Sequence, residues 1–417
     1  MKTLLLIVRK SLAQHGLSTT VTILASALGA GLVLSVLTIS AQSERAFTGG
    51  SLGFDAVLGA RGSPLQLVLN TVYHLETSPG NLPWSTYASL REDPRVGLAL
   101  PYAVGDSFRG FRVVGTTTEL FTDFEYELGQ RLRFREGQAF HPERREAVLG
   151  ATVARRLGLA PGSRIRPQHG VGAAAVHLEE HEEDYMVVGV LAPTGTPSDR
   201  VVWIPIEGVF RMGGHVLRGD GTDYVAEAGV PVPEEHREVS AVLLKFSGAQ
   251  AGFQLEREFN REGTEATLAW PLGRSIAELF EKLGWVNRVL ELVSYLVCVV
   301  AAGAILASLT NAMNERRREF AILRALGAHR TTVFTAIVLE SCVIAGLGAL
   351  LGFAVHALLY VVVARFVEER TGVIVELLAF HPALLFTPLA MTALGLLAGV
   401  LPACKAYATD VATHLQA

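Results

Sequence analysis

Two histidines spaced four residues apart, His177 and His181, have the spacing of a metal-binding pair. On a helix, residues at this spacing lie on one face, and zinc sites use such pairs of imidazoles. The surrounding acidic stretch, residues 169–184, adds His169, Glu179, Glu180, Glu182, Glu183 and Asp184. No third ligand has a fixed spacing, and His215 or His236 would have to approach through folding. Because short His-rich tracts are compositional hints only, a solvated acidic loop is the simpler interpretation and a zinc site is the alternative.

The stretch from Asn311 to Ala328 combines basic and apolar side chains between two long apolar runs. Its expected docking residues are Glu315, Arg316, Arg317, Arg318, Glu319, Phe320, Ile322, Leu323, Arg324, Leu326 and Gly327. A short helix with one basic and one apolar face suits docking onto a soluble protein at the cytoplasmic side of a membrane. The alternative is a solvated loop whose arginines only set topology. Such a loop has no need of apolar side chains, so we prefer the docking helix.

Charged and small residues also occur inside the apolar runs. Glu340 lies about two turns inside the third run, where a carboxylate is costly and usually has a partner. It either pairs with Arg324 or Arg330, or reaches the water at the lipid headgroups. In the first run, Ala25 and Gly29 have the spacing that lets helices approach closely. This indicates a packed helix seam, and ordinary packing within the bundle of one chain explains it equally well.

Motifs for nucleotide hydrolysis and for common enzyme chemistry are absent. The chain contains no Gly-x-x-x-x-Gly-Lys-Ser/Thr and no Gly-Lys pair at all, so it has no P-loop to hold a nucleotide. Gly-x-Ser-x-Gly, His-Glu-x-x-His and Cys-x-x-Cys are absent too. We therefore expect no catalytic residue and no cofactor in this chain, and any use of ATP requires a separate polypeptide.

The composition predicts a membrane protein with a large water-exposed part. Half of the 417 residues are hydrophobic and 18% are charged, which is too apolar for an ordinary soluble protein and too charged for one embedded wholly in lipid. A bilayer core needs about 20 apolar residues, and four runs meet this requirement: 20–41, 285–313, 333–366 and 383–404. We expect an integral membrane α-helical protein with four transmembrane helices. A mixed α+β extracytoplasmic domain, residues 42–274, is expected between the first and second helices.

Lysines and arginines set the expected orientation. Basic residues occur before the first run, in the loop 314–332 and in the tail 405–417, whereas the loop 367–382 is net acidic. The positive-inside rule then places both termini and the arginine loop in the cytoplasm. The first run exceeds the apolar core of a signal peptide, so we expect an uncleaved anchor after an interfacial helix over residues 1–19. A net charge of −4 without a basic stripe argues against a nucleic-acid partner.

The region between the first two runs has the pattern of a folded domain without disulfides, since all three cysteines lie in the apolar runs. We predict a division into two subdomains near residue 135. The expected strands cover Phe111–Gly115, Tyr185–Leu191, Arg200–Pro205 and Ala241–Phe246. The expected helices cover Trp84–Arg91, Ala151–Leu159 and Gly252–Arg261.

A long amphipathic element follows this domain. Ser275 and Glu278 match a capping box in front of an apolar rhythm that continues into the second run. We predict one helix over residues 275–313, roughly 55–60 Å long at 1.5 Å per residue. Such a helix would project beyond the bilayer as a stalk, and the long third run would join it.

The motifs together resemble the permeases of the FtsX/MacB/LolC–LolE class of ABC transporters. The resemblance is carried by Glu319–Ala328, Glu146–Gly150, Ala154–Gly162, Val188–Leu191 and the tail Pro402–Asp410. It covers the whole chain, and the segment Glu319–Ala328 resembles the coupling helix of these permeases. Two features depart from the family pattern: Asp410 is followed by Val411 where the family has proline, and the ATPase domain fused in MacB is absent.

The resemblance implies a non-catalytic permease subunit in the bacterial inner membrane. It would work as a homodimer, or with a paralogue, beside a dimer of ABC ATPase subunits and with a possible periplasmic adaptor or lipoprotein. ATP would bind the partner, whose hydrolysis would move the outer domain. One alternative is an FtsX-like regulator that activates a periplasmic partner without transport. Another is a metal-linked transporter or sensor that uses the histidine-rich loop.

Overall fold

The computed structural model describes residues 2–14, 16–48, 53–170, 181–212, 230–315, 329–371 and 380–408. The chain divides into two compact units. The helical unit comprises residues 1–43, 283–365 and 376–417, and the outer unit comprises residues 44–282 and 366–375.

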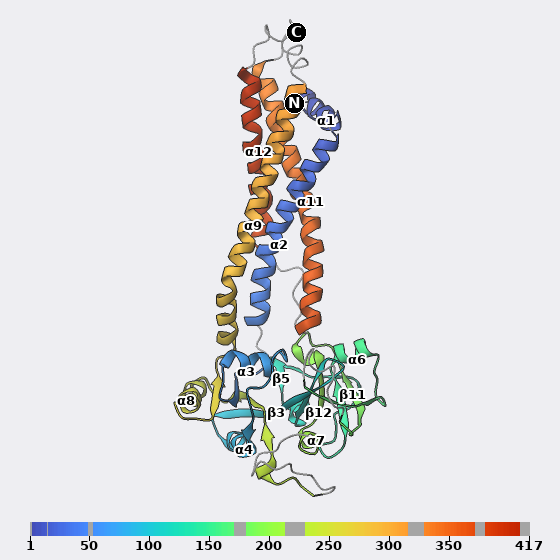
Figure 1. Ribbon diagram of the computed structural model, residues 1–417, viewed down its shortest axis with the longest axis vertical. Helices are drawn as coiled ribbons and strands as arrows, with labels where there is room; N and C mark the ends of the chain where they lie inside the picture. The colour runs from blue at the N-terminus through green and yellow to red at the C-terminus, as the bar shows by residue number, and fades with distance from the viewer. Residues whose placement is uncertain are drawn as a thin grey trace. The chain divides into compact units, whose positions relative to one another are not determined.

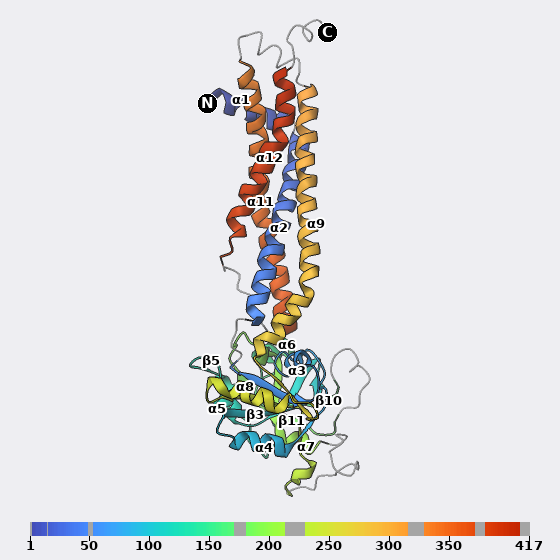
Figure 2. The ribbon, with the colours of Figure 1, turned by 90° about the vertical axis from the view of Figure 1, so that its left-hand side faces the viewer.

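Long apolar helices and a short amphipathic helix form the described part of the helical unit. They are α1 (Lys2–Gln14), α2 (Gly16–Thr48), α9 (Leu272–Glu315), α11 (Arg330–Thr371) and α12 (Ala383–Ala408). Among the described residues, four segments are long and apolar enough to cross a membrane: Gly16–Ser43, Gly284–Asn311, Arg330–Thr371 and Ala383–Cys404. The four predicted spans all lie within them or overlap them. α2, α9, α11 and α12 run side by side in both views (Figures 1 and 2).

Small residues set the packing between these helices. A Cβ atom added to Gly352 of α11 would lie 2.7 Å from the Cβ of Ala30 in α2. On α12, a Cβ at Gly395 would lie 2.3 Å from the Cβ of Ala345 in α11. These distances are shorter than real Cβ atoms tolerate, so glycine is what allows the helices to approach. Leu292 and Leu296 of α9 are instead exposed, as lipid-facing residues of a membrane helix would be.

α9 is one continuous helix of 44 residues, about 66 Å long at 1.5 Å per residue. The predicted continuous helix is therefore present, but it begins three residues before Ser275, directly after Pro271. Ser275 lies within the first turns and is buried, so it is not the N-terminal cap that the sequence pattern suggested. α2 likewise begins at Gly16, before the predicted start of the first span at residue 20.

The outer unit lies between α2 and α9 in the sequence and mixes strands with short helices. Its elements are β1 (Ala56–Ala60), α3 (Pro64–Thr71), β2 (Leu82–Pro83), α4 (Trp84–Glu92), β3 (Val96–Phe108), β4 (Phe111–Thr116), α5 (Glu119–Thr122), β5 (Glu125–Glu127), β6 (Gln130–Arg131), β7 (Phe134–Gly137), β8 (Glu146–Leu149), α6 (Ala151–Leu157), β9 (Arg164–Ile165), β10 (Gln168–His169), β11 (Tyr185–Leu191), a 3-10 helix (Pro197–Arg200), β12 (Val201–Pro205), α7 (Ile206–Phe210), a 3-10 helix (Glu234–His236), β13 (Glu238–Val239), β14 (Ala241–Phe246), α8 (Ala249–Phe259) and β15 (Ala266–Ala269). The expected strands and helices of this domain correspond to β4, β11, β12, β14, α4, α6 and α8.

One sheet organises the outer unit, with strand order β15-β1-β14-β3-β4-β12-β8-β11-β7. β10 pairs with β3, and β9 pairs with β11. The predicted division near residue 135 falls inside β7, and strands from both sides of it share this sheet. The long strand β3 connects the two halves, because it pairs with β14 on one side and with β4 on the other.

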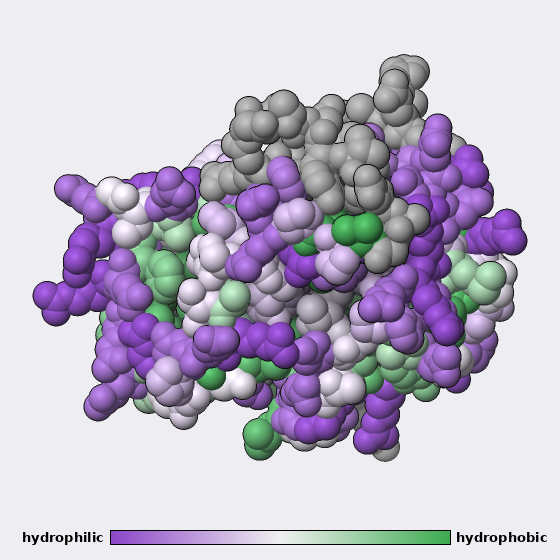
Figure 3. All heavy atoms as spheres, turned by 90° about the horizontal axis from the view of Figure 1, so that it is seen from below, coloured by the Kyte–Doolittle hydropathy of each residue, from purple (hydrophilic) through white to green (hydrophobic). Residues whose placement is uncertain are grey.

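The core of the outer unit lies on both faces of this sheet. Every residue of β1, β4 and β12 is buried, so both faces of these strands are covered, and Arg112 of β4 is the one charged residue among them. Trp203 of β12 is fully buried and packs edge-on against Tyr102, with ring centroids 5.6 Å apart. Seen from below, the molecule presents mainly hydrophilic residues, as a water-exposed domain should (Figure 3).

Candidate functional site

Strand pairing brings an acid and two histidines together in the outer unit. β10 runs antiparallel to β3, and its register places His169 directly opposite Asp106. Asp106 follows a register shift in the pairing of β3 with β4. Such irregularities change the direction in which the neighbouring side chains point. The amide of Gly170 donates to the carbonyl of Gly105 (2.9 Å), and that of His181 donates to the carbonyl of Pro167 (3.1 Å). We call Asp106, His169 and His181 the Asp–His–His cluster.

The ligand atoms of the Asp–His–His cluster all lie within 4.8 Å of one another. The Oδ1 atom of Asp106 is 3.3 Å from Nε2 of His181 and 3.5 Å from Nδ1 of His169. The two imidazole rings have centroids 4.0 Å apart. Asp106 and His181 are buried, whereas the His169 side chain keeps 30% of its surface exposed. The arrangement can hold a proton or a cation between one carboxylate and two imidazoles.

The predicted histidine pair is only partly described. His181 belongs to the Asp–His–His cluster, while His177 lies outside the described residues. Two of the expected acidic neighbours pair with arginines: Asp184 with Arg166 at 2.9 Å and Glu183 with Arg145 at 4.0 Å. Asp106 is not among the site residues predicted from the sequence. The one sequence feature that could have indicated Asp106 is its position directly after Gly105 in an otherwise apolar segment.

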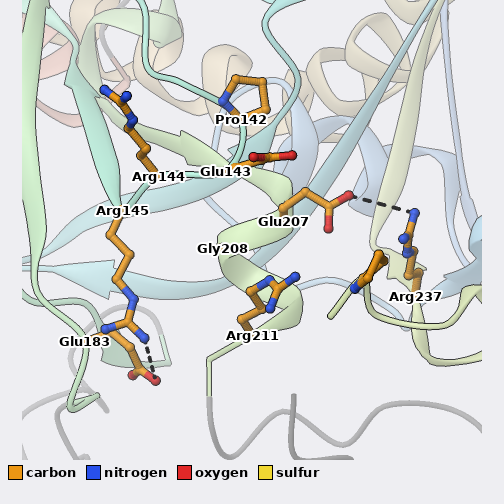
Figure 4. Close-up of a pocket in the computed structure, with 10 residues that line it drawn as sticks. Pro142, Glu143, Arg144, Arg145, Glu183, Glu207, Gly208, Arg211 and Arg237 are labelled. Carbon is orange, nitrogen blue, oxygen red and sulfur yellow. Dashed lines mark ion pairs between the residues drawn. The ribbon is translucent and has the colours of Figure 1, made fainter. Parts of the chain in front are cut away.

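A second polar site is a pocket of about 630 Å³ in the outer unit. Its walls come from the segment before β8, from α7 and from the residues that precede β13 (Figure 4). Its charged residues are Glu143, Arg144, Arg145, Glu183, Glu207, Arg211 and Arg237. Glu207 pairs with Arg237 at 3.8 Å across the pocket. Side chains of both signs suit a polar or charged partner group more than an apolar ligand.

Glu340 is a buried carboxylate in the helical unit, with 9% of its surface exposed. The hydroxyl of Ser11 in α1 donates a 2.6 Å hydrogen bond to its Oε1 atom. This contact joins the predicted interfacial helix to α11 and partly satisfies a costly group. Arg324 lies outside the described residues, so its pairing with Glu340 stays a prediction.

Gly29 and Ala25 differ in their surroundings. A Cβ atom at Gly29 would lie 3.6 Å from Cα and Sγ of Cys298 in α9, an ordinary packing distance within this chain. Ala25 is only partly buried. The structure thus places Gly29 in the intramolecular bundle.

Most of the expected docking stretch lies outside the residues that the structure describes. Glu315 is the last residue of α9. The remaining predicted docking residues, within 316–328, lie outside the described residues, and α11 begins shortly afterwards at Arg330. Its position between α9 and α11 in the chain is as expected, and its docking role stays a prediction.

Comparison with known proteins gives matches over most of the chain. Residues 19–241, more than half of it, match the family described as MacB-like periplasmic core domain. Residues 291–411 match the family described as FtsX-like permease C-terminal. The macrolide export ATP-binding/permease protein MacB of Azoarcus sp. (strain BH72) is 28% identical over 313 residues, which cover 70% of this chain. The chain spans 42% of the length of that relative.

Two solved structures are also similar. The periplasmic region of MacB from Actinobacillus actinomycetemcomitans is 10% identical, with 55% of this chain and 94% of that one covered and a TM-score of 0.32. The extracellular domain of the noncanonic ABC-type transporter YknZ from Gram-positive bacteria is 13% identical, with 51% and 97% covered and a TM-score of 0.28. The sequence matches alone carry the assignment: the chain belongs to the family of FtsX-like permeases that have a MacB-like periplasmic core domain.

Proposed function

We propose that this chain is the membrane subunit of an ABC system and couples ATP hydrolysis on a separate ATPase to movement of its outer unit. Membership of the FtsX-like permease family is the observation that carries this proposal. The name of the MacB relative combines ATP binding with a permease. The present sequence contains no P-loop motif, so a partner chain would supply the nucleotide site.

Helix continuity supports transmission between the two units. Residues 272–282 of α9 belong to the outer unit, and the rest of the helix belongs to the helical unit. α2 and α11 also contribute residues to both units. α9 contains no proline, which is a common cause of sharp helix kinks, and we infer that a displacement at one end reaches the other.

Within the outer unit, the end of α11 forms ion pairs with α6. Glu368 lies 3.7 Å from Arg155 of α6, and Glu369 lies 3.1 Å from Arg156. These side chains are exposed, so each pair contributes at most about 1 kcal/mol. We infer that these ion pairs orient α6 relative to the end of α11 and add little to the stability of the fold.

The proposed assembly contains two copies of the chain, or one copy and a paralogue, with two ATPase subunits. The termini and the docking stretch face the cytoplasm, and the outer unit faces the periplasm. This orientation follows from the basic residues at the cytoplasmic loops. Residues 315–327 then contact the ATPase.

Replacing Leu323 and Leu326 together by aspartate tests the docking role. The full-length chain is co-expressed with a candidate ABC ATPase from the same genome, and the complex is isolated from membranes. We expect the double variant to insert normally but to lose the ATPase, because it buries two carboxylates in an apolar contact. The matched control is Leu128→Asp, since Leu128 is 94% exposed on the outer unit. Undiminished co-purification of the double variant would refute the docking role.

A further inference from the structure

We propose that the Asp–His–His cluster binds a divalent transition-metal ion, with Zn²⁺ as the reference ion. The cluster lies in the outer unit and is independent of the ATPase docking proposed above. Three donor groups converge there from two paired strands and from the segment that precedes β11. Two imidazole nitrogens and one carboxylate oxygen are a donor set that zinc sites with an open fourth position use.

Two of the distances between the donor atoms are close to those around a shared ion. Asp106 Oδ1 lies 3.3 Å from His181 Nε2 and 3.5 Å from His169 Nδ1. A charge-assisted hydrogen bond between such atoms would be about 2.7–2.9 Å long. Tetrahedral ligands held about 2.0–2.1 Å from zinc are instead separated by about 3.3–3.4 Å. The two distances from Asp106 Oδ1 are close to this wider spacing, although the 3.3 Å contact is also within hydrogen-bond range, and the ligand nitrogens of the two histidines lie within 4.8 Å of each other.

Burial makes charge compensation a requirement at this point of the sheet. The Asp106 side chain is 4% exposed and that of His181 is 2% exposed. A carboxylate in such a place is costly unless a positive charge neutralises it. Protonation of one imidazole would neutralise Asp106 through an ion pair such as the 3.3 Å contact with His181, and this is the alternative to a metal ion. A divalent cation bound by Asp106 and two neutral imidazoles would leave one net positive charge, which an anionic fourth ligand such as hydroxide would balance.

Backbone hydrogen bonds hold the ligands in place. Asp106 and His169 are opposite residues of the β3–β10 ladder, and the His181 amide is bonded to the carbonyl of Pro167. Ligands on paired strands keep their geometry better than ligands on free loops. His169 is the most exposed of the three and marks the side from which an ion and a water ligand can enter. Nitrogen donors favour zinc, copper or nickel over Mg²⁺ and Ca²⁺.

The experiment uses the full-length chain, purified in detergent without a polyhistidine tag and stripped with a chelator. The protein is dialysed against ZnCl₂ in the presence of excess Mg²⁺, and bound zinc is measured by mass spectrometry. The variants are His169→Gln and His181→Gln, and the matched control is His141→Gln, at an exposed histidine outside the cluster. We expect stoichiometric zinc in the wild type and in the control. Each cluster variant should bind at least about 100-fold more weakly, since the loss of even an outer-shell partner costs 10–100-fold.

Substitution with Co²⁺ gives a second readout that does not depend on affinity. Tetrahedral Co²⁺ absorbs visible light strongly, so the wild type should show these bands and His169→Gln should not. His169 is partly exposed, so this variant should fold even if the more buried His181→Gln does not. The proposal is wrong if the wild type takes up no zinc beyond that of folded His169→Gln. The cluster would then be a hydrogen-bonded group that only packs β10 against β3.

Discussion

At the scale of single residues, Asp106, His169 and His181 form the group of potential metal ligands found among the described residues. The Asp–His–His cluster depends on Asp106, which lies 75 residues before His181. Spacing rules detect ligands that share one helix or one loop, and they cannot detect partners that strand pairing brings together. His181 was selected because it lies four residues after His177, yet its described neighbours are Asp106 and His169.

His74 provides a prediction about pH at the same scale. Burial of the ring, with the nearby charges of Arg112 and Arg200, lowers the pKa of His74 to about 3 from 6.5. In the folded protein the ring stays neutral at pH values where the unfolded chain takes up a proton. The contribution of the neutral His74 ring to the free energy of unfolding is therefore complete above pH 6.5. It decreases as the pH falls from 6.5 towards 3. The loss approaches about 1.4 kcal/mol per pH unit.

The test compares unfolding free energies at pH 6.5 and pH 5, from denaturant curves followed by tryptophan fluorescence. His74→Asn should show a smaller decrease than the wild type, because asparagine does not titrate there. Asparagine also tolerates the positive φ of 56° at this position. His141→Asn, at an exposed site, should retain the wild-type decrease. An unchanged decrease in His74→Asn would show that other groups cause it.

At the scale of elements, apolar patterning predicted the helices and central strands well. β4, β11, β12 and β14 are short runs rich in branched or aromatic residues, which period and propensity rules detect. β3 was harder to recognise, because Gly97, Pro101 and Gly105 interrupt its pattern. Tertiary pairing with β14 and β4 holds it as a strand of 13 residues. The same pairing joins the two predicted subdomains into one sheet.

The continuity of α9 leads to a prediction about coupling. Replacing Val286 by proline removes a backbone hydrogen bond and costs about 3 kcal/mol or more in a helix interior. We expect ATP hydrolysis by the reconstituted complex to persist, because the docking stretch is unchanged. The output of the outer unit, measured as substrate release or partner activation, should be lost.

Val286→Ala is the matched control, since alanine keeps the helix. It should retain both hydrolysis and output. If Val286→Pro keeps full output at normal expression, α9 does not transmit motion. The membrane subunit would then need another connection, and α2 and α11 would be the next helices to interrupt.

At the scale of the whole molecule, charge asymmetry predicts the orientation in the membrane. The four apolar helices and the family assignment indicate an inner-membrane protein with a periplasmic domain. Lys2, Arg9 and Lys10 before α2, together with the arginines between α9 and α11, predict that these parts lie in the cytoplasm. Arginine and lysine in short loops determine the orientation because their charge hinders translocation. The composition of the large outer unit has little effect on the orientation.

Accessible cysteines test this orientation with a control that the chain itself provides. In a background with Cys298→Ala and Cys342→Ala, the remaining native thiol is Cys404, which is exposed at the end of the fourth candidate span. A second chain carries Cys404→Ala and Ser247→Cys, since Ser247 is exposed on the outer unit. In cells with a permeabilised outer barrier, an impermeant thiol reagent should label position 247 at once. It should label Cys404 only after the inner membrane is opened, because the bilayer separates the reagent from the cytoplasm. Labelling in the reverse order would show that the topology is inverted. The arginine stretch would then lie outside the cytoplasm, and ATPase docking at residues 315–327 would lose its basis.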